Sequence, residues 1–318
     1  MSIHPSVLMA LKEVKRRELH GAALITRLVL NALSKAAVDS KAKSPEDLFK
    51  ELSEYGNLLV KSRPTAVLLT NGIRHVLYHV KTGAEKGQHV EELKNAAKHQ
   101  AADFLKQLDE SIEKIGQMGA RRMGENDVIL THGYSTSVLS ILRRAQEEGK
   151  NIKVIATETR PEYQGRLMAR ELVRRGIPTT IIIDSAVYNF MREVDKVLVG
   201  AEAVAANGAI VNKIGTSTIA SVAHESRVRV FVAAGIYKFS SETMFGELIE
   251  IEERDPLFVV PKRELQKIGD VSVRNPAFDV TPPEHIDLII TERGVIPPQG
   301  AIFVLRERRD MPVLGLES

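Results

Sequence analysis

The hydrophobic pattern of the chain changes near Gly124, and this change constrains the fold more than any other feature of the sequence. Before it, apolar residues such as Val7 and Leu11 recur at helical spacing, and no strand pattern occurs. After it, short continuous apolar runs alternate with helical stretches. The sequence therefore predicts an N-terminal helical domain over residues 1–123 and an α/β domain over residues 124–318.

The first part of the chain carries several helix signals. Ser44 is placed to cap a helix whose first helical residue is Pro45, and acidic residues follow in its first turn. A second helical run begins at Ala22, directly after a glycine. Residues 89–120 form one long, charged and amphipathic stretch. These signals predict a mostly helical N-terminal part.

Six short apolar runs follow Gly124, at residues 127–130, 153–157, 179–183, 196–199, 228–233 and 288–291. They are mostly continuous rather than alternating, which is typical of parallel strands buried on both faces of a sheet. The stretches between them, such as residues 135–148 and 165–175, have the length of crossover helices. The sequence therefore predicts an α/β fold with a Rossmann-like, doubly wound and mostly parallel sheet. Ligands bind such sheets beyond the carboxyl ends of the strands.

Composition excludes several classes of function. The chain has 318 residues and no cysteine, so disulfides, thiolate metal sites and thiol nucleophiles are excluded. Its 44 basic and 41 acidic side chains are too evenly balanced to indicate nucleic-acid binding. His75 and His79 lie four residues apart, but no acidic residue accompanies them in register. We therefore expect no metal, no cofactor and no direct nucleic-acid contact.

The sequence carries no signal for a membrane. Its first residues alternate apolar and charged side chains and lack the uninterrupted apolar core of a signal peptide. No stretch has the length and apolarity needed to cross a bilayer. We expect a cytoplasmic protein.

The stretch THGYSTS, residues 131–137, follows the first strand candidate and opens a helix. Its hydroxyl groups and free amides would lie at the positive end of the helix dipole, where anions bind. Ser135 or Thr136 capping the helix is an equally good explanation of the same residues. The candidate anion-binding residues here are Ser135, Thr136 and Ser137.

Two further strand candidates end in charged residues. Arg160 follows the second strand, where its guanidinium could reach a phosphate or carboxylate, or could simply pair with Glu158 or with a neighbouring subunit. Asp184 ends the third strand, where it could contact a ligand or cap the next helix. Both residues are candidates for ligand binding.

Residues 200–217 concentrate the largest set of candidate binding groups. Glu202 follows a strand candidate, and Asn207-Gly208 is typical of a tight turn. Asn212, Lys213 and the following Gly-Thr pair then supply an amide, an ammonium group, a flexible backbone and a hydroxyl group. This set favours phosphate binding, although its spacing is not that of a Walker loop. Lys238, after a later strand, is a further candidate cation.

Two helix starts in the N-terminal part could also donate amides to an anion, His20-Gly21-Ala22-Ala23 and Arg63-Pro64-Thr65. By composition alone, both are ordinary loop sequences.

Nearly the whole chain resembles one superfamily. The matching stretches are RPTAV, THGYS, TETRP with EYQG, VGAE with NG and NKIGT, YKF and NPAFDVTPPEHIDLIITERG. The superfamily joins the alpha, beta and delta regulatory subunits of translation initiation factor 2B to ribose-1,5-bisphosphate isomerase and methylthioribose-1-phosphate isomerase. The resemblance implies a helical domain followed by a Rossmann-like domain, assembled as a dimer that can build a hexamer.

The resemblance also implies where two phosphates are held. Family members hold them with residues matching His20, Gly21, Ala22, Ala23, Arg63, Ser135, Thr136, Ser137, Asn212, Lys213 and Lys238. The family often has arginine at the position of His20, so one contact is weakened here while the backbone amides are kept.

The catalytic pair of the isomerases is a cysteine and an aspartate, and this chain departs from both. Gly133 stands at the cysteine position and Glu202 at the aspartate position. Glycine cannot transfer a proton, and a carboxylate that is one methylene longer reaches a different point. The resemblance therefore implies a non-catalytic, alpha-type regulatory protein. It would bind a sugar phosphate or nucleoside monophosphate, and its expected protein partner is the alpha subunit of initiation factor 2.

The alternative is an aldose–ketose isomerase of the ribose-1,5-bisphosphate type. It would use Glu202, with Asp184 or His132, in place of the absent thiol.

Overall fold

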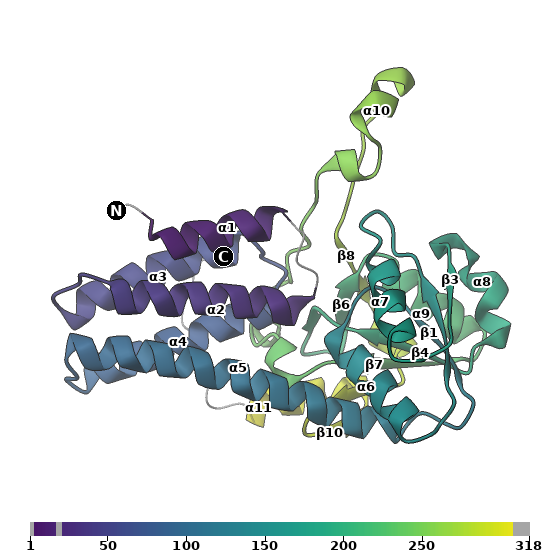
Figure 1. The fold of residues 1–318 in the computed structure, drawn as a ribbon, viewed down its shortest axis with the longest axis horizontal. Coiled ribbons are helices and arrows are strands. Elements are labelled where there is room, and N and C mark those ends of the chain that lie inside the picture. Colours follow the sequence, from purple (N-terminus) through teal and green to yellow (C-terminus); the bar gives the residue numbers. More distant parts are fainter. Residues whose placement is uncertain (1–2, 17–20, 308–318) are drawn as a thin grey trace.

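The computed structural model describes residues 3–16 and 21–307, and its N-terminal part is a bundle of α-helices (Figure 1). The helices are α1 (Pro5–Arg16), α2 (Ala22–Asp39), α3 (Pro45–Lys61), α4 (Val67–Glu85) and α5 (Val90–Ala120). Ser44 caps α3 as predicted, because its side chain accepts a hydrogen bond from the amide of Asp47.

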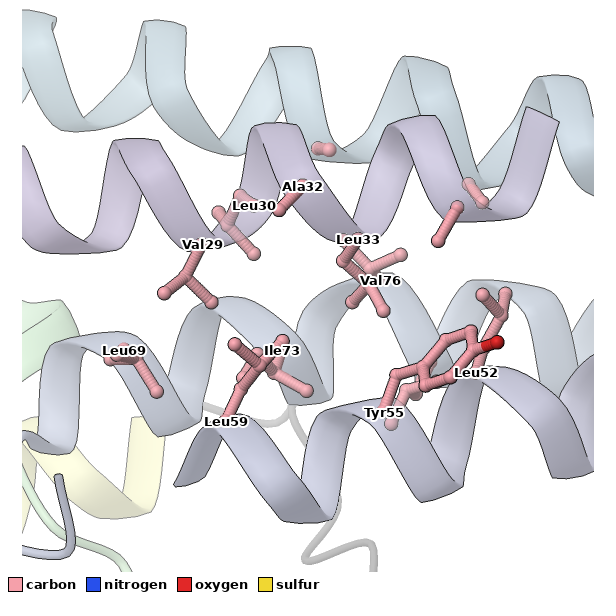
Figure 2. Packing of buried hydrophobic residues seen from close by; sticks show 14 of the residues in the cluster. Val29, Leu30, Ala32, Leu33, Leu52, Tyr55, Leu59, Leu69, Ile73 and Val76 are labelled. Carbon is pink, nitrogen blue, oxygen red and sulfur yellow. The ribbon is translucent and has the colours of Figure 1, made fainter. Parts of the chain in front are cut away.

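The core of this bundle forms where the apolar faces of the helices meet (Figure 2). Leu30 and Leu33 of α2 pack among Leu59 of α3 and Ile73 of α4, and all four are fully buried. Removing side chains of this kind from water supplies most of the stability of such a bundle.

A seven-stranded sheet forms the C-terminal part, in the order β10-β9-β7-β4-β1-β2-β3. All neighbouring strands are parallel except the edge pair β9 and β10. The strands are β1 (Val128–Thr131), β2 (Lys153–Thr157), β3 (Thr179–Ile182), β4 (Lys196–Gly200), β7 (Arg229–Ala233), β9 (Leu288–Thr291) and β10 (Gly294–Ile296). The predicted α/β class and mostly parallel sheet are confirmed, and each of the six predicted runs is a strand.

Helices cover both faces of this sheet. α6 (Thr136–Glu147) and α7 (Gln164–Val173) share one core with the end of α5. α8 (Val187–Phe190), α9 (Thr216–Glu225) and α11 (Ala301–Glu307) bury their apolar residues in a core on the opposite face. This burial on both faces explains why the strands are continuous apolar runs.

The long helix α5 belongs to both parts of the molecule, as Figure 1 shows. Phe104 and Leu108 lie in the core of the helical bundle, whereas Ile115 and Ala120 lie in the core between the sheet and α6. A division into two domains at residue 123 therefore stays a prediction.

A second, three-stranded antiparallel sheet was not predicted. It contains β5 (Ala203–Val204), β6 (Ile210–Lys213) and β8 (Phe278–Thr281). The predicted tight turn at Asn207-Gly208 connects β5 to β6, with Gly208 at a φ of +87°. Asn212 and Lys213 lie on strand β6, not in the loop that their sequence suggested.

The segment between β7 and β8 leaves the body as a long arm that ends in α10 (Lys262–Ile268; Figure 1). Among the described residues, no helix combines the length and apolarity required to span a membrane.

Candidate functional site

A cleft lies where the carboxyl ends of the central strands meet the helical bundle, and it holds about 940 Å³ of space, including its opening to solvent. It brings together most of the predicted site residues from both parts of the chain. The predicted residues that line it are Gly21, Ala22, Ala23, Arg63, Ser135, Thr136, Ser137, Glu202, Asn212, Lys213 and Lys238.

Two helices begin at this cleft. Ser135 caps α6, because its side chain accepts a hydrogen bond from the amide of Val138 at 3.3 Å. Ser135 can pack closely against Gly200 because glycine has no side chain. A Cβ at position 200 would lie 2.7 Å from the Ser135 hydroxyl oxygen. α2 begins at Ala22 after Gly21, which has a φ of +93° and gives no side-chain cap. First-turn amides lack partners inside their own helix, so both helix starts are suited to bind anions.

Glu202 and Lys238 form the second feature of the cleft. The Glu202 side chain is buried, with a residue exposure of 9%, and its Oε1 has no hydrogen-bond partner among the described residues. Lys238 Nζ donates to the carbonyl oxygen of Ala201 at 2.6 Å. Burial lowers the pKa of Lys238, and the nearby charge of Glu202 opposes that shift. The wall of the cleft therefore contains a buried carboxylate with one oxygen that no described protein group satisfies.

Lys238 is held in place from the helical bundle. The Asn71 side chain, on α4, donates hydrogen bonds to the carbonyl oxygens of Tyr237 and Phe239, on either side of Lys238. The helical part thus positions a cation that belongs to the α/β part.

Lys213 also lines the cleft, and it belongs to a buried network of ion pairs. Its Nζ is 3.0 Å from Glu162 Oε2, and the other oxygen of Glu162 pairs with Arg254. Arg254 is also 3.1 Å from Glu252, which in turn lies 3.3 Å from Arg63. Every side chain in the network is less than 10% exposed.

Asn212 and Asp279 fix the start of α9. Asn212 Nδ2 donates to the hydroxyl group of Thr216 at 3.0 Å, and that hydroxyl donates to the carbonyl oxygen of Lys213. Asp279 Oδ2 accepts hydrogen bonds from the amides of Gly215 and Ser217. Burial raises the pKa of Asp279 to about 6.

His132 is fully engaged in the protein's own hydrogen bonds. Its Nε2 lies 2.7 Å from the carbonyl oxygen of Ile214, which can only accept, so Nε2 carries the proton. Its Nδ1 accepts from the Thr157 hydroxyl group at 2.6 Å. Burial lowers the pKa of His132, which keeps the ring neutral. Neither ring nitrogen is free to act as an acid or a base.

Gly133 occupies the loop beside Lys213 with a φ of +77°. A Cβ at this position would lie 3.5 Å from Lys213 Cβ, so space is available but the backbone conformation disfavours any side chain. The loop at this point contributes its backbone to the cleft.

Two predicted residues of the described part of the chain do not join the group in the cleft. Asp184 accepts hydrogen bonds from the amides of Thr159 and Arg160, so it holds the neighbouring loop rather than capping the helix that follows it. Arg160 points to the exposed side, where it donates to the hydroxyl group of Tyr163. Its expected pairing with Glu158 is wrong, because Glu158 pairs with Arg166. His20 lies outside the described residues.

Among the polar residues that line the cleft, the sequence reasoning missed Gln164 and Arg254 as site residues. Gln164 lies within the EYQG match and donates to Glu162 at 2.9 Å. Arg254 lies in a charged segment with no recognisable spacing. Among residues 3–16 and 21–307, no group of three or more histidine, aspartate or glutamate side chains is placed to hold a metal.

Comparison with known proteins places these features in context. The chain is 48% identical to the ribose 1,5-bisphosphate isomerase of Pyrococcus furiosus, over 93% of this chain and 92% of that protein. It is 44% identical to the enzyme of the same name from Thermococcus kodakarensis, over 96% of both chains. The crystal structure of the Pyrococcus horikoshii translation initiation factor eIF-2B matches 98% of this chain and all of its own, with a TM-score of 0.80 and 32% identity.

These relatives overturn the expectation of a non-catalytic regulatory protein, which is wrong. The curated relatives that match at 44% and 48% identity are named as isomerases. The expectation from sequence gave too much weight to the missing thiol and to the different reach of Glu202, whose carboxylate the cleft keeps buried.

The chain carries the fold, the cleft and the sequence stretches of one known group of proteins. A family model matches residues 18–298, and the chain accordingly belongs to the Initiation factor 2 subunit family.

Proposed function

We propose that the protein is an aldose–ketose isomerase that acts on ribose 1,5-bisphosphate or a closely related sugar phosphate. The observation that carries the proposal is the carboxylate of Glu202, which is buried in the cleft with one oxygen free of protein partners. The names of the relatives with 44–48% identity support the same reaction.

The charge of the cleft suits a doubly phosphorylated substrate. Four cationic side chains line it, Arg63, Lys213, Lys238 and Arg254, and the starts of α2 and α6 add backbone amides. Phosphate oxygens accept hydrogen bonds from groups of both kinds. Helix starts from the two parts of the chain give the cleft two separate places for phosphate groups.

In ribose 1,5-bisphosphate, C1 is bonded to the ring oxygen and to a phosphate ester oxygen. The isomerisation breaks the bond from C1 to the ring oxygen, which takes a proton and becomes the C4 hydroxyl group, while a hydrogen leaves C2 and one joins C1. In the proposed mechanism the Glu202 carboxylate removes the proton from C2 as the bond from C1 to the ring oxygen breaks, which leaves an enol with a double bond between C1 and C2. The Glu202 carboxylic acid then returns a proton to C1, and the C2 hydroxyl group releases its proton to solvent and becomes the carbonyl group. Negative charge develops on the ring oxygen before it takes a proton from solvent, and the Lys238 ammonium group beside Glu202 stabilises this charge.

The surrounding residues favour Glu202 over the other acid–base candidates. Both nitrogens of His132 are already hydrogen-bonded inside the protein, and Asp184 holds the loop after β2. Gly133 has no side chain to transfer a proton. Glu202 alone among the four lies in the cleft with an unused oxygen.

The comparisons give no support for contact with the alpha subunit of initiation factor 2. Self-association as a dimer or hexamer stays a prediction, which sedimentation of the purified protein tests.

The decisive experiment is a turnover assay with ribose 1,5-bisphosphate, followed by NMR in D₂O. The wild type should form the ketose and incorporate deuterium from the solvent, because the proton passes through an exchangeable carboxyl group. Glu202→Gln should lower kcat by on the order of 10²- to 10⁴-fold, since the amide cannot accept the proton. Glu225→Gln, the same change at an exposed position, is the matched control. A wild type without turnover refutes the proposal, and conversion without deuterium uptake refutes the proton-transfer step.

A further inference from the structure

The cleft has an ion cluster that the matching sequence stretches indicate only in part, because Glu252 and Arg254 lie outside them. It consists of three cations, Arg63, Lys213 and Arg254, and two carboxylates, Glu162 and Glu252. With all five groups ionised its net charge is +1, from three positive and two negative groups. Arg254 is its centre, because it pairs with both carboxylates.

The cations and the carboxylates of the cluster lie differently with respect to the cleft. All three cations line the cleft, whereas neither Glu162 nor Glu252 is among the lining residues. The carboxylates therefore lie behind the cations as seen from the cleft. They separate like charges that would otherwise repel one another, and they fix the orientation of the guanidinium groups.

Arg254 is also placed against the same ring as Lys213. The Lys213 ammonium group lies 5.0 Å from the centre of the Phe278 ring, and the Arg254 guanidinium carbon lies 5.5 Å from it. Glu162 bridges the two cations on the side away from the cleft. The two cationic side chains thus form one unit beside the same ring.

Replacing a buried ion pair with well-packed apolar residues is often neutral or stabilising. A buried ion cluster is therefore weak evidence for a role in stability alone. A cluster with a net positive charge, opening only through its cations into a cleft, is suited to bind an anion.

We infer that Arg254 is a further substrate-binding residue, which donates with Lys213 to one phosphate group of the sugar phosphate. Glu162 and Glu252 are positioning residues that hold Arg254 and Arg63 for this contact. The identity of the ligand as a sugar bisphosphate rests on the proposed function, whereas the assignment of Arg254 as an anion ligand does not.

The test is calorimetric binding of ribose 1,5-bisphosphate and of inorganic phosphate. It is done in a Glu202→Gln background, where the proposed chemistry cannot consume the ligand. Arg254→Lys keeps the charge but loses the planar fork, and the dissociation constant should rise on the order of tenfold or more. Glu162→Gln keeps an oxygen that can accept from Arg254, and so keeps that side chain in position, while it raises the charge of the cluster from +1 to +2. Binding should therefore stay equal or become tighter. Arg274→Lys is the matched control, because Arg274 is an exposed arginine of the arm that pairs with Glu253. This substitution should leave the dissociation constant unchanged.

A purely structural cluster predicts a different pattern, in which Arg254→Lys and Glu162→Gln weaken binding alike. That result, or unchanged binding in Arg254→Lys, overturns the inference. If Arg254→Lys does not fold, the direction of the Glu162→Gln effect decides. Weaker binding in Arg254→Lys than in its parent, together with no turnover by the wild type, refutes the proposed function and leaves the role of Arg254 standing.

Discussion

Asp279 should make the stability of the protein depend on pH in a way that one substitution removes. Its carboxylate accepts hydrogen bonds from the amides of Gly215, at 2.7 Å, and Ser217, at 3.1 Å. These bonds lower its pKa, but the cost of burial is larger and raises it from 3.8 to about 6. A difference of that size corresponds to roughly 3 kcal/mol between the two protonation states.

The direction of the effect follows from which state binds the proton more tightly. Between about pH 4 and pH 6 the folded protein holds a proton on Asp279 that the unfolded chain has released. The stability that this proton confers is complete below about pH 4 and is lost as the pH rises through about 6. Asp279→Asn keeps an oxygen acceptor for the two amides but has no proton to lose. The stability of the variant relative to the wild type should therefore increase by up to roughly 3 kcal/mol from pH 4 to pH 7.

Urea unfolding at four pH values from 4 to 7, followed by circular dichroism, measures this difference. Asp270→Asn, at an exposed position of the arm, is the matched control and should show no such trend. A difference between Asp279→Asn and the wild type that is constant over this range would refute the reasoning. If the stability of Asp279→Asn relative to the wild type decreases with rising pH, the expected direction of the effect is wrong.

Three further predictions follow from the geometry. Gly133→Ala should lower the free energy of unfolding by about 1–2 kcal/mol in urea titrations, because the φ of +77° disfavours alanine while space is available. Lys238→Met should lower kcat at least about tenfold in the turnover assay, because it removes the cation beside Glu202, and circular dichroism should show an intact fold. Gly165→Ala should lower the melting temperature, because its Cβ would lie 1.7 Å from the carbonyl oxygen of Thr157 and α7 must move away from β2, which costs about 1–3 kcal/mol. Unchanged stability in either glycine variant, or unchanged kcat in Lys238→Met, would contradict the corresponding argument.

The central strands of the main sheet were predictable because they are buried on both faces, whereas the edge strand β10 is only half-buried and was not predicted. A run such as 153–157 has no polar residue between its apolar ones, so its length and composition identify it without any knowledge of its neighbours. β5, β6 and β8 were not predictable in this way. They are two to four residues long, and β6 ends in Asn212 and Lys213, whose polar side chains resemble a loop. Their pairing is established only by contacts between distant segments.

The candidate site was predictable where residues follow a strand or begin a helix, as Ser135 and Glu202 do. Arg254 was not, because its importance comes from Glu162 and Glu252 and from the cleft that the fold creates around them. Asp184 was misplaced for a related reason. A carboxylate at the end of a strand can accept from any nearby amide, and here the nearest free amides belong to the loop after β2.

Helix α5 determines how a ligand can enter. Its 31 residues form one unbroken rod of about 46 Å, and Ser111, Ile112 and Ile115 in its last third form part of the cleft wall. Because the rod is anchored in one core at each end, the two halves of the molecule cannot swing apart about that wall without bending it or pulling it out of a core. The width of the cleft is therefore set by the fold before any ligand arrives, and binding requires no closing motion between the two halves.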